Sequence, residues 1–375
     1  MKQLEGVRLE RSRSLQSQIT GLIRAAVRAG RWRAGERLPT TRALAAHWGA
    51  DPGTVHHALR VLVREGWLTR RPRAGTFVRD RAAKLTQVAV YYPEHRWEDS
   101  QTLFLHSLHG ALKSVCNTQG ATTEAWVDPR PAAAAERWPW PDLVTALERG
   151  EFQALIVPYT DPVSLRWLAA LPVPSVFVTS ANLPNVVGFD LAQFADLAFS
   201  ALARQGCRSV GLISAVSTGT PGAAGVRERG TEFYERVLAI CQACGLTLRN
   251  EWMRLPPKPG LEPAEHGPFG YDQFHALWRQ RTRPDGLVVY PDSMAVGAIL
   301  AAAQLNVRVP RDLRLVFHRN AGVPLLCPLP ATFVVSDERM LAEAIWRQLR
   351  DQFDGQQVSP RLVSFTLQPS NSKEL

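Results

Sequence analysis

The sequence predicts a multidomain protein, with a small α+β domain at the N-terminus followed by a two-lobed α/β domain built on doubly wound parallel sheets. Residues 15–78 carry helix and hairpin signals in a defined order, and the rest of the chain alternates short apolar, β-branched runs with helical ones. The charge is also unevenly placed. Residues 1–81 hold 17 Lys and Arg against 6 Asp and Glu, whereas the remainder holds 27 against 28.

The first predicted helix begins at Leu15. Apolar side chains recur there at intervals that place them on one face of an α-helix. Gly30 is expected to end it, because glycine readily adopts the left-handed conformation that closes a helix. The apolar stripe consists of Leu15, Ile19, Leu22, Ile23, Ala26 and Val27.

Two further helices follow in close succession. Thr40 is a good N-cap for the second helix, which Gly49 ends. Asp51 caps the third, and Pro52 suits its first position because the missing N–H would have no helical partner there. Two helices joined by a short turn form a helix-turn-helix, whose second helix enters the major groove of DNA. The third helix buries Val55, Ala58, Leu59, Leu62 and Val63.

A hairpin closes this domain. Residues 67–79 read as two short strands around a turn that contains Pro72 and Gly75, which is the wing of a winged helix-turn-helix. We therefore expect a DNA-binding domain over residues 8–80 and a linker over 81–86.

The side chains left on the open face are those expected to contact DNA. Glycine permits close approach to a phosphate, threonine and histidine can bond phosphates or base edges, and arginines clamp the backbone. One surface arginine taken alone is equally well explained by solvation, but the set together favours DNA, and no strongly basic amphipathic helix suggests a membrane surface. The candidates are Arg42, Gly53, Thr54, His56, His57, Arg60, Arg71, Arg73 and Gly75.

The larger domain is predicted from its alternating pattern. Ligands of doubly wound sheets bind beyond the carboxyl ends of the strands, so the residues after each strand are candidates. Buried parallel strands are expected at 88–92, 154–158, 175–179, 209–214, 286–290 and 313–317, and helices at 102–118, 191–205, 228–243 and 294–305.

Asp190, Arg227 and Asp292 form the candidate ligand site. Two carboxylates and a fork-shaped guanidinium facing one another across a cleft can bind the hydroxyls of a sugar or polyol. Trp97 and Ser100, after the first strand, complete the candidate site. The alternative from spacing alone is that the two aspartates are helix N-caps and the arginine is a surface residue.

The N-terminal segment resembles the DNA-binding domain of GntR-family transcription regulators. The resemblance rests on GRWRAGERLPTTRALAAHWG, TVHHALRVLVREGWL and RAGTF, and covers about 65 residues. It implies that Arg42 contacts the DNA backbone, that Thr54 lies in the recognition helix and that Gly75 is the tip of the wing. The chain departs from the pattern where Pro52 and His56 replace arginines common in the family.

From Val88 to about Ser370 the chain resembles the effector domain of LacI/GalR regulators, which is similar to periplasmic sugar-binding proteins. The motifs are VVGFDLAQFADLAFSALARQGCRSVGLIS, RERG and PDGLVVYPDSMAVGAILAAAQLNVRVPRDLRLV. The resemblance implies ligand contacts for Arg227 and Asp292, and a hinge or ligand role for Asp190. The chain departs from the family at Pro291, at Gln368, and at FHRN, where Gly-Phe-Asp-Asp is usual.

The resemblance also divides the effector domain, residues 87–370, into two lobes. We expect lobe 1 at about 87–205 and 310–335, and lobe 2 at about 206–309 and 336–370. The segments 131–141 and 256–270 are proline-rich and are expected to be surface insertions.

Other classes of protein and site are not favoured. No apolar run approaches the ~20 residues that span a bilayer and no export signal begins the chain, so a cytoplasmic protein is expected. The five cysteines lack a disulfide framework and are expected to be reduced. Cys241 and Cys244 form a C-x-x-C without a second ligand pair, so neither metal nor cofactor is expected.

The leading hypothesis is a homodimeric, DNA-binding transcription regulator, a repressor gated by a small-molecule effector. One alternative is a regulator whose pocket no longer responds to any ligand. A pyridoxal-phosphate enzyme fusion would need a lysine after a strand, which Lys84, Lys113, Lys258 and Lys373 do not provide, so no enzyme is expected. A solute-binding protein is disfavoured by the basic N-terminal domain and the missing export signal.

Overall fold

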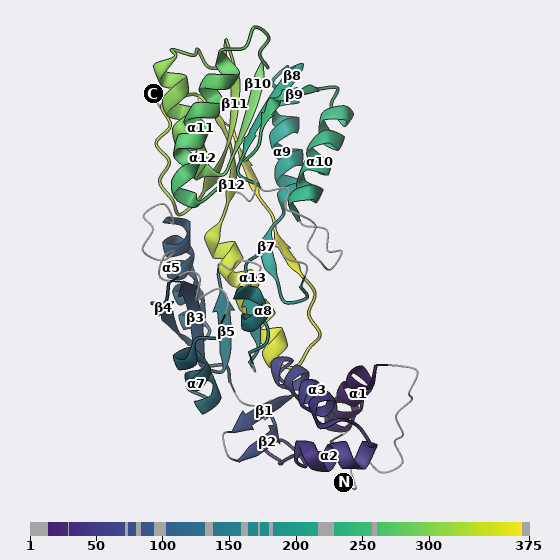
Figure 1. Ribbon diagram of the computed structural model, residues 1–375. Coiled ribbons are helices and arrows are strands. Elements are labelled where there is room, and N and C mark those ends of the chain that lie inside the picture. Colours follow the sequence, from purple (N-terminus) through teal and green to yellow (C-terminus); the bar gives the residue numbers. More distant parts are fainter. Residues whose placement is uncertain are drawn as a thin grey trace.

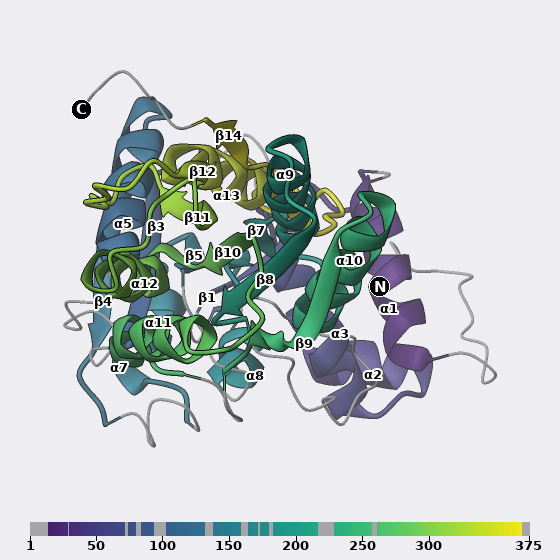
Figure 2. The ribbon, with the colours of Figure 1, turned by 90° about the horizontal axis from the view of Figure 1, so that it is seen from above.

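The computed structural model describes residues 14–28, 30–71, 74–79, 84–93, 103–131, 138–158, 164–171, 173–179, 183–216, 229–256 and 261–369. A small N-terminal head lies at one end of an elongated body, and the body consists of two α/β lobes stacked end to end (Figure 1). The view from above shows the sheet of each lobe between its helices (Figure 2).

The head is a winged helix-turn-helix. Its helices pack around one apolar core, and its two strands pair antiparallel, with Leu68 opposite Val78 and Arg71 opposite Gly75. The predicted buried stripe of the third helix is confirmed residue by residue. The elements are α1 (Leu15–Arg28), α2 (Thr41–Trp48), α3 (Pro52–Arg64), β1 (Leu68–Arg71) and β2 (Gly75–Val78).

Lobe 1 is built on a parallel sheet of order β4-β3-β5-β6. Alternate residues of β3 point to opposite faces: Val88, Val90 and Tyr92 pack with α5 and α13, whereas Ala89 and Tyr91 pack with α7 and α8. The elements are β3 (Gln87–Pro93), α5 (Leu103–Thr118), β4 (Thr122–Asp128), α7 (Pro141–Arg149), β5 (Ala154–Val157), α8 (Ser164–Leu168), β6 (Ser175–Phe177), β7 (Val187–Phe189), α13 (Glu338–Phe353) and β13 (Arg361–Val363).

Lobe 2 is built on a six-stranded sheet of order β14-β12-β11-β10-β8-β9, in which β14 alone runs antiparallel to its neighbour. Helices α9 and α10 cover one face, and α11 and α12 cover the other. The elements are α9 (Leu191–Arg204), β8 (Ser209–Ser214), α10 (Arg229–Ala243), β9 (Thr247–Arg254), α11 (Pro263–Trp278), β10 (Gly286–Tyr290), α12 (Asp292–Gln304), β11 (Arg314–Asn320), β12 (Thr332–Ser336) and β14 (Thr366–Gln368).

The chain crosses between the lobes three times: from β7 to α9, from β12 to α13, and from β13 to β14. The predicted lobe boundaries are wrong for this reason. Residues 191–205 and 310–335 contribute to lobe 2 rather than lobe 1, and α13 packs on α5 in lobe 1 rather than in lobe 2. The sequence pattern predicts strands and helices but not which sheet each strand joins.

The proline-rich segments are only partly insertions. Glu262 and Glu265 form a capping box at the start of α11, and Pro263 occupies its first turn, so the second half of the predicted insertion 256–270 is helical. Pro141, at the end of the segment 131–141, likewise begins α7. Residues 132–137 and 257–260 lie outside the described part of the chain.

Candidate DNA-binding face and interlobe site

The start of α3 is fixed by the predicted cap. Asp51 Oδ1 accepts hydrogen bonds from the backbone N–H groups of Gly53 (2.7 Å) and Thr54 (3.2 Å), which satisfies two of the free donors at the helix start. Gly53 and His57 are exposed on the first turns, and Thr54 is half-buried. These three predicted DNA contacts therefore share the end of α3 that is open to solvent.

The start of α2 and the wing add further predicted contacts. Arg42 is exposed, one residue into α2. Gly75, at the start of the second wing strand, has a φ of +116°, a backbone conformation that favours glycine over residues with a Cβ atom. The Arg71 guanidinium lies 4.6 Å from the ring centre of Phe77. Arg73 lies outside the described residues.

His56 and Arg60 lie on a different side of α3, turned toward lobe 1. His56 Nδ1 is 3.1 Å from a guanidinium nitrogen of Arg70, and Arg60 donates to the backbone carbonyl of Ala170. Burial, followed by the charges of Arg70 and Arg60, lowers the pKa of His56, so the neutral form is favoured. The sequence could not predict that the body faces this part of the recognition helix.

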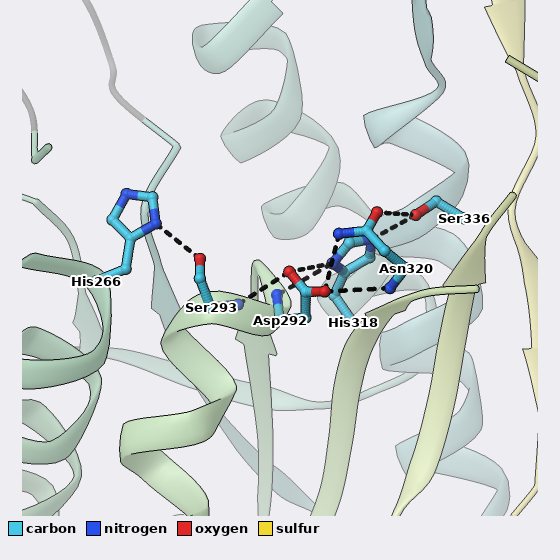
Figure 3. A network of polar contacts seen from close by, with 6 residues as sticks. All are labelled: His266, Asp292, Ser293, His318, Asn320 and Ser336. Carbon is cyan, nitrogen blue, oxygen red and sulfur yellow. Dashed lines mark hydrogen bonds and ion pairs between the residues drawn. The ribbon is translucent and has the colours of Figure 1, made fainter. Parts of the chain in front are cut away.

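Asp292 lies at the start of α12, directly after β10 and Pro291, at the carboxyl edge of the lobe 2 sheet. Its side chain is buried and fully engaged (Figure 3). Oδ1 accepts from the backbone N–H of Ser293 (2.9 Å), and Oδ2 accepts from the side chain (2.8 Å) and backbone (3.3 Å) of Asn320. The protein itself thus supplies donors to both carboxylate oxygens.

His318 and Ser336 close this network. His318 Nδ1 accepts from the backbone N–H of Asp292 (3.1 Å), so its proton lies on Nε2, which is 2.9 Å from Ser336 Oγ. Ser336 in turn donates to Asn320 Oδ1 (2.6 Å). Burial lowers the pKa of His318 to about 4, so the imidazole is neutral. His266 extends the network from α11, with Nδ1 2.8 Å from Ser293 Oγ.

Aromatic rings surround His318 on the remaining sides. Its ring centre lies 4.8 Å from that of Tyr290, 5.8 Å from Phe365 and 6.0 Å from Phe194. Phe365 belongs to the third crossing between the lobes, and its ring centre lies 5.3 Å from that of Phe189, at the end of β7. The network around Asp292 is therefore packed directly against the hinge.

The structure describes only one of the other predicted ligand residues. Asp190 is the N-cap of α9, where Oδ1 accepts from the backbone N–H of Gln193 (3.0 Å), as the alternative reading proposed. Arg227, Trp97 and Ser100 lie outside the described residues. His318 and Asn320 directly follow the predicted strand 313–317, so they are among the candidate positions after each strand, but they are not in the predicted ligand set. Both belong to the FHRN segment that departs from the LacI/GalR pattern.

The five cysteines are free, and burial raises the pKa of Cys241 to about 12, so its thiol is unreactive near neutral pH. In the described part of the chain, no group of three or more His, Cys, Asp or Glu side chains is placed to hold a metal ion. No helix among the described residues is long and apolar enough to cross a membrane.

Two family descriptions match the chain. Residues 15–78 match bacterial regulatory proteins of the gntR family, and residues 199–370 match the periplasmic binding protein-like domain. The chain joins a GntR-type DNA-binding head to a periplasmic-binding-protein-like body. This domain composition and the α/β architecture confirm the predicted fold class.

Curated relatives of the GntR-type head and of the body are transcription regulators. The repressor PurR of Pectobacterium atrosepticum is 26% identical over 141 residues, which is 37% of this chain and 39% of PurR. The regulator TauR of Rhodobacter capsulatus is 45% identical over 65 residues, which is 17% of this chain and 13% of TauR. The matches thus span less than half the length of these relatives.

Solved structures share the fold of the periplasmic-binding-protein-like body. The transcriptional regulator CelR, solved with cellobiose, aligns with a TM-score of 0.59 at 16% identity, covering 89% of this chain and all of CelR. A LacI-family regulator from Clostridium acetobutylicum aligns with a TM-score of 0.58 at 15% identity, covering 76% of this chain and all of that protein. At these identities the comparisons show that the body has the fold of these proteins.

Proposed function

We propose that the protein is a homodimeric transcription regulator, a repressor that acts in the cytoplasm and is gated by a small-molecule effector bound between the lobes. The observation that carries the proposal is the joining of a GntR-type head to a two-lobed body whose lobes are linked by three crossings. Closure of such lobes on a ligand changes the positions of the heads relative to operator half-sites.

DNA binding is supported by the open end of α3 and by the charge of the head. Gly53 and His57 are exposed and Thr54 is half-buried at the helix start, and the exposed Arg42 lies on the neighbouring helix. Helix N-termini and arginines position a protein on phosphates, whereas side chains of the recognition helix read base edges.

Fluorescence anisotropy with DNA from upstream of the protein's own gene tests this proposal. Arg42→Ala should weaken binding to all sequences and lower its salt dependence, because it removes a phosphate contact. His57→Ala should instead change the preference among sequences. Failure of the wild-type protein to prefer any sequence would overturn the proposal.

The effector class is inferred from Asp292 and its surroundings. A buried carboxylate at the carboxyl edge of a parallel sheet, with amide, hydroxyl and aromatic groups beside it, suits a sugar or polyol. A thermal-shift screen of sugars, polyols and nucleosides tests this, since a ligand that binds only the folded state raises the melting temperature. Asp292→Asn should abolish the shift while DNA binding is retained.

One observation favours a second candidate, a regulator that responds to no ligand. Both oxygens of Asp292 already accept hydrogen bonds from Ser293 and Asn320. A ligand hydroxyl would have to displace one of these donors, leaving it buried and unsatisfied. If no compound in the screen shifts the melting temperature while specific DNA binding persists, this second function is the correct one.

A further inference from the structure

The recognition helix packs against lobe 1 through its C-terminal half. Arg60 donates to the carbonyl of Ala170 and Arg64 to that of Ala169 (3.2 Å), both in the turn that follows α8. A protein carbonyl is an acceptor, as a phosphate oxygen is, so these two arginines already have partners within the chain. The N-terminal half of α3 remains open, as described above.

A second contact joins the head to the end of α13. A Cβ atom on Gly66, in the turn after α3, would lie within 3.0 Å of the backbone oxygens of Gln352 and Phe353, so the two backbones touch. The Arg79 guanidinium lies 3.4 Å from the ring centre of Phe353. Burial lowers the pKa of Arg79 to about 10, which is the mark of a cation removed from water.

Between these contacts, the head and lobe 1 line an open pocket of about 810 Å³. Its lining comes from the wing and α3 of the head and from the end of α7 in lobe 1. Helix α7 lies next to the wing in Figure 1. Glu148 is an acidic residue of the lining, and its charge acts on Arg70. The head contributes residues of α3, β1 and β2, among them His56, Arg70 and Gly75.

Some of the predicted DNA contacts lie at this junction: His56 and Gly75 are half-buried and line the pocket, and Arg60 is bonded to lobe 1, whereas Arg71 lines the pocket but stays exposed. A recognition helix must enter a major groove about 12 Å wide and 8.5 Å deep, with the flanking phosphates on either side. Lobe 1, beside the C-terminal half of α3 and the wing, occupies space that a flanking phosphate backbone would need.

We propose that lobe 1 is a docking surface for the wing-side face of the head, formed by the C-terminal half of α3 and the wing, so that the docked state has low affinity for DNA and binding requires the head to separate from lobe 1. The proposal rests on the proposed function for the identity of that face. It adds an intramolecular competitor for DNA, formed by the end of α7, the turn after α8 and the end of α13.

Charge reversal at Glu148 tests the docking in the full-length protein. Glu148→Arg places a like charge opposite Arg70 in the pocket and should destabilise the docked state, which should tighten DNA binding about fivefold or more. Glu151→Arg is the matched control, because it makes the same change in net charge at an exposed residue nearby that does not line the pocket. Equal affinities of the two variants would overturn the proposal.

Arg79→Ala provides an independent variant. Removing a positive charge ordinarily weakens DNA binding. Here the loss of the stacking on Phe353 should release the head, so Arg79→Ala should bind DNA more tightly than the wild-type protein. Weaker or unchanged binding would contradict docking.

Hydrogen exchange gives a readout that does not involve DNA. Amides in the turn after α3, around Gly66, should exchange faster in Glu148→Arg than in the wild-type protein, and at an unchanged rate in Glu151→Arg. If exchange responds in this way but none of the proteins binds DNA, docking is upheld and the proposed function fails. Unchanged exchange in Glu148→Arg overturns docking itself.

Discussion

His318 is buried on β11, between β10 and β12, and its hydrogen bonds require the neutral imidazole. Its Nδ1 accepts from the backbone of Asp292, and Nε2 pairs with Ser336 Oγ. A protonated imidazole has no acceptor lone pair, so protonation would break the bond to the Asp292 N–H. Burial among aromatic rings is what holds the pKa low.

His318 should therefore make the stability of the protein depend on pH. Its pKa is about 4 in the folded state against 6.5 ordinarily, so the unfolded chain takes up the proton first as the pH falls. The free energy of unfolding is therefore unaffected by this titration above about pH 6.5 and falls as the pH drops toward 4. At pH 4.5 the expected loss is on the order of 2 kcal/mol. Urea unfolding at pH 7 and at pH 4.5 measures this change in the free energy of unfolding.

His318→Asn is the comparison for this measurement. It should be less stable than the wild-type protein at pH 7, but it should lose less stability between pH 7 and 4.5, because its side chain does not titrate. An identical loss in both proteins would show that other groups cause the pH dependence.

The network around Asp292 could be predicted only in part. Asp292 itself follows from its place after a buried strand. His318 and Asn320 likewise follow a predicted strand, but their pairing with Asp292 could not be predicted, because it depends on the parallel register that pairs Val289 with Phe317 and brings the ends of β10 and β11 together. Asp190 shows the opposite case, since an N-cap is a local feature that the sequence already offers as an alternative.

At the scale of elements, α11 and α12 pack with unusually close backbones. A Cβ atom on Gly270 would lie within 3.0 Å of the carbonyl oxygen of Met294, and one on Gly297 would lie within 3.0 Å of that of Gly267. Only hydrogen atoms fit at these positions. The close contact places α12, and with it Asp292, firmly against the sheet edge.

Gly297→Ala should therefore destabilise the protein by about 2 to 3 kcal/mol, because a methyl group must force two helices apart. Helix propensity alone predicts that replacing glycine with alanine stabilises a helix, so a loss of stability in Gly297→Ala would have to come from the packing. Gly110→Ala in α5 is the matched control, since nothing lies within 4 Å of its Cβ position, and it should be neutral or stabilising. Thermal unfolding of both variants measures the difference in stability. A Gly297→Ala variant as stable as the wild-type protein would refute the packing argument.

Elements with local signals were predicted well from the sequence. The bounds of α3, β8 and β10 follow from caps, glycines and β-branched runs that lie within the element itself. The first half of α11 was taken for an insertion because proline disfavours helix interiors, and Pro268 does lie inside the helix. Packing against α12 outweighs this local cost.

At the scale of the whole molecule, α12 presents an apolar surface to solvent. Val296 is 55% exposed and Leu300 is 61% exposed, one turn apart on the same helix. Exposed apolar pairs of this kind are candidates for contact with a second copy of the chain. We expect this face of lobe 2 to contribute to the proposed homodimer.

Leu300→Glu should then shift the protein from dimer toward monomer in sedimentation velocity, because it buries a charge in the interface. Leu238→Glu on α10 is the matched control, since Leu238 is equally apolar and 55% exposed but lies on another helix. A dimer unaffected by Leu300→Glu would place the interface elsewhere.

The position of α13 has a consequence for synthesis of the protein. Leu341, Ile345 and Leu349 complete a core that β3 and α5 begin more than two hundred residues earlier. At ribosomal rates, those two elements wait roughly ten to forty seconds for their partner, with apolar surface open to chaperones or to other nascent chains. The head, whose core lies within residues 19–78, has no such delay. A newly made head is thus folded before Phe353, and the surface it docks on, has left the ribosome.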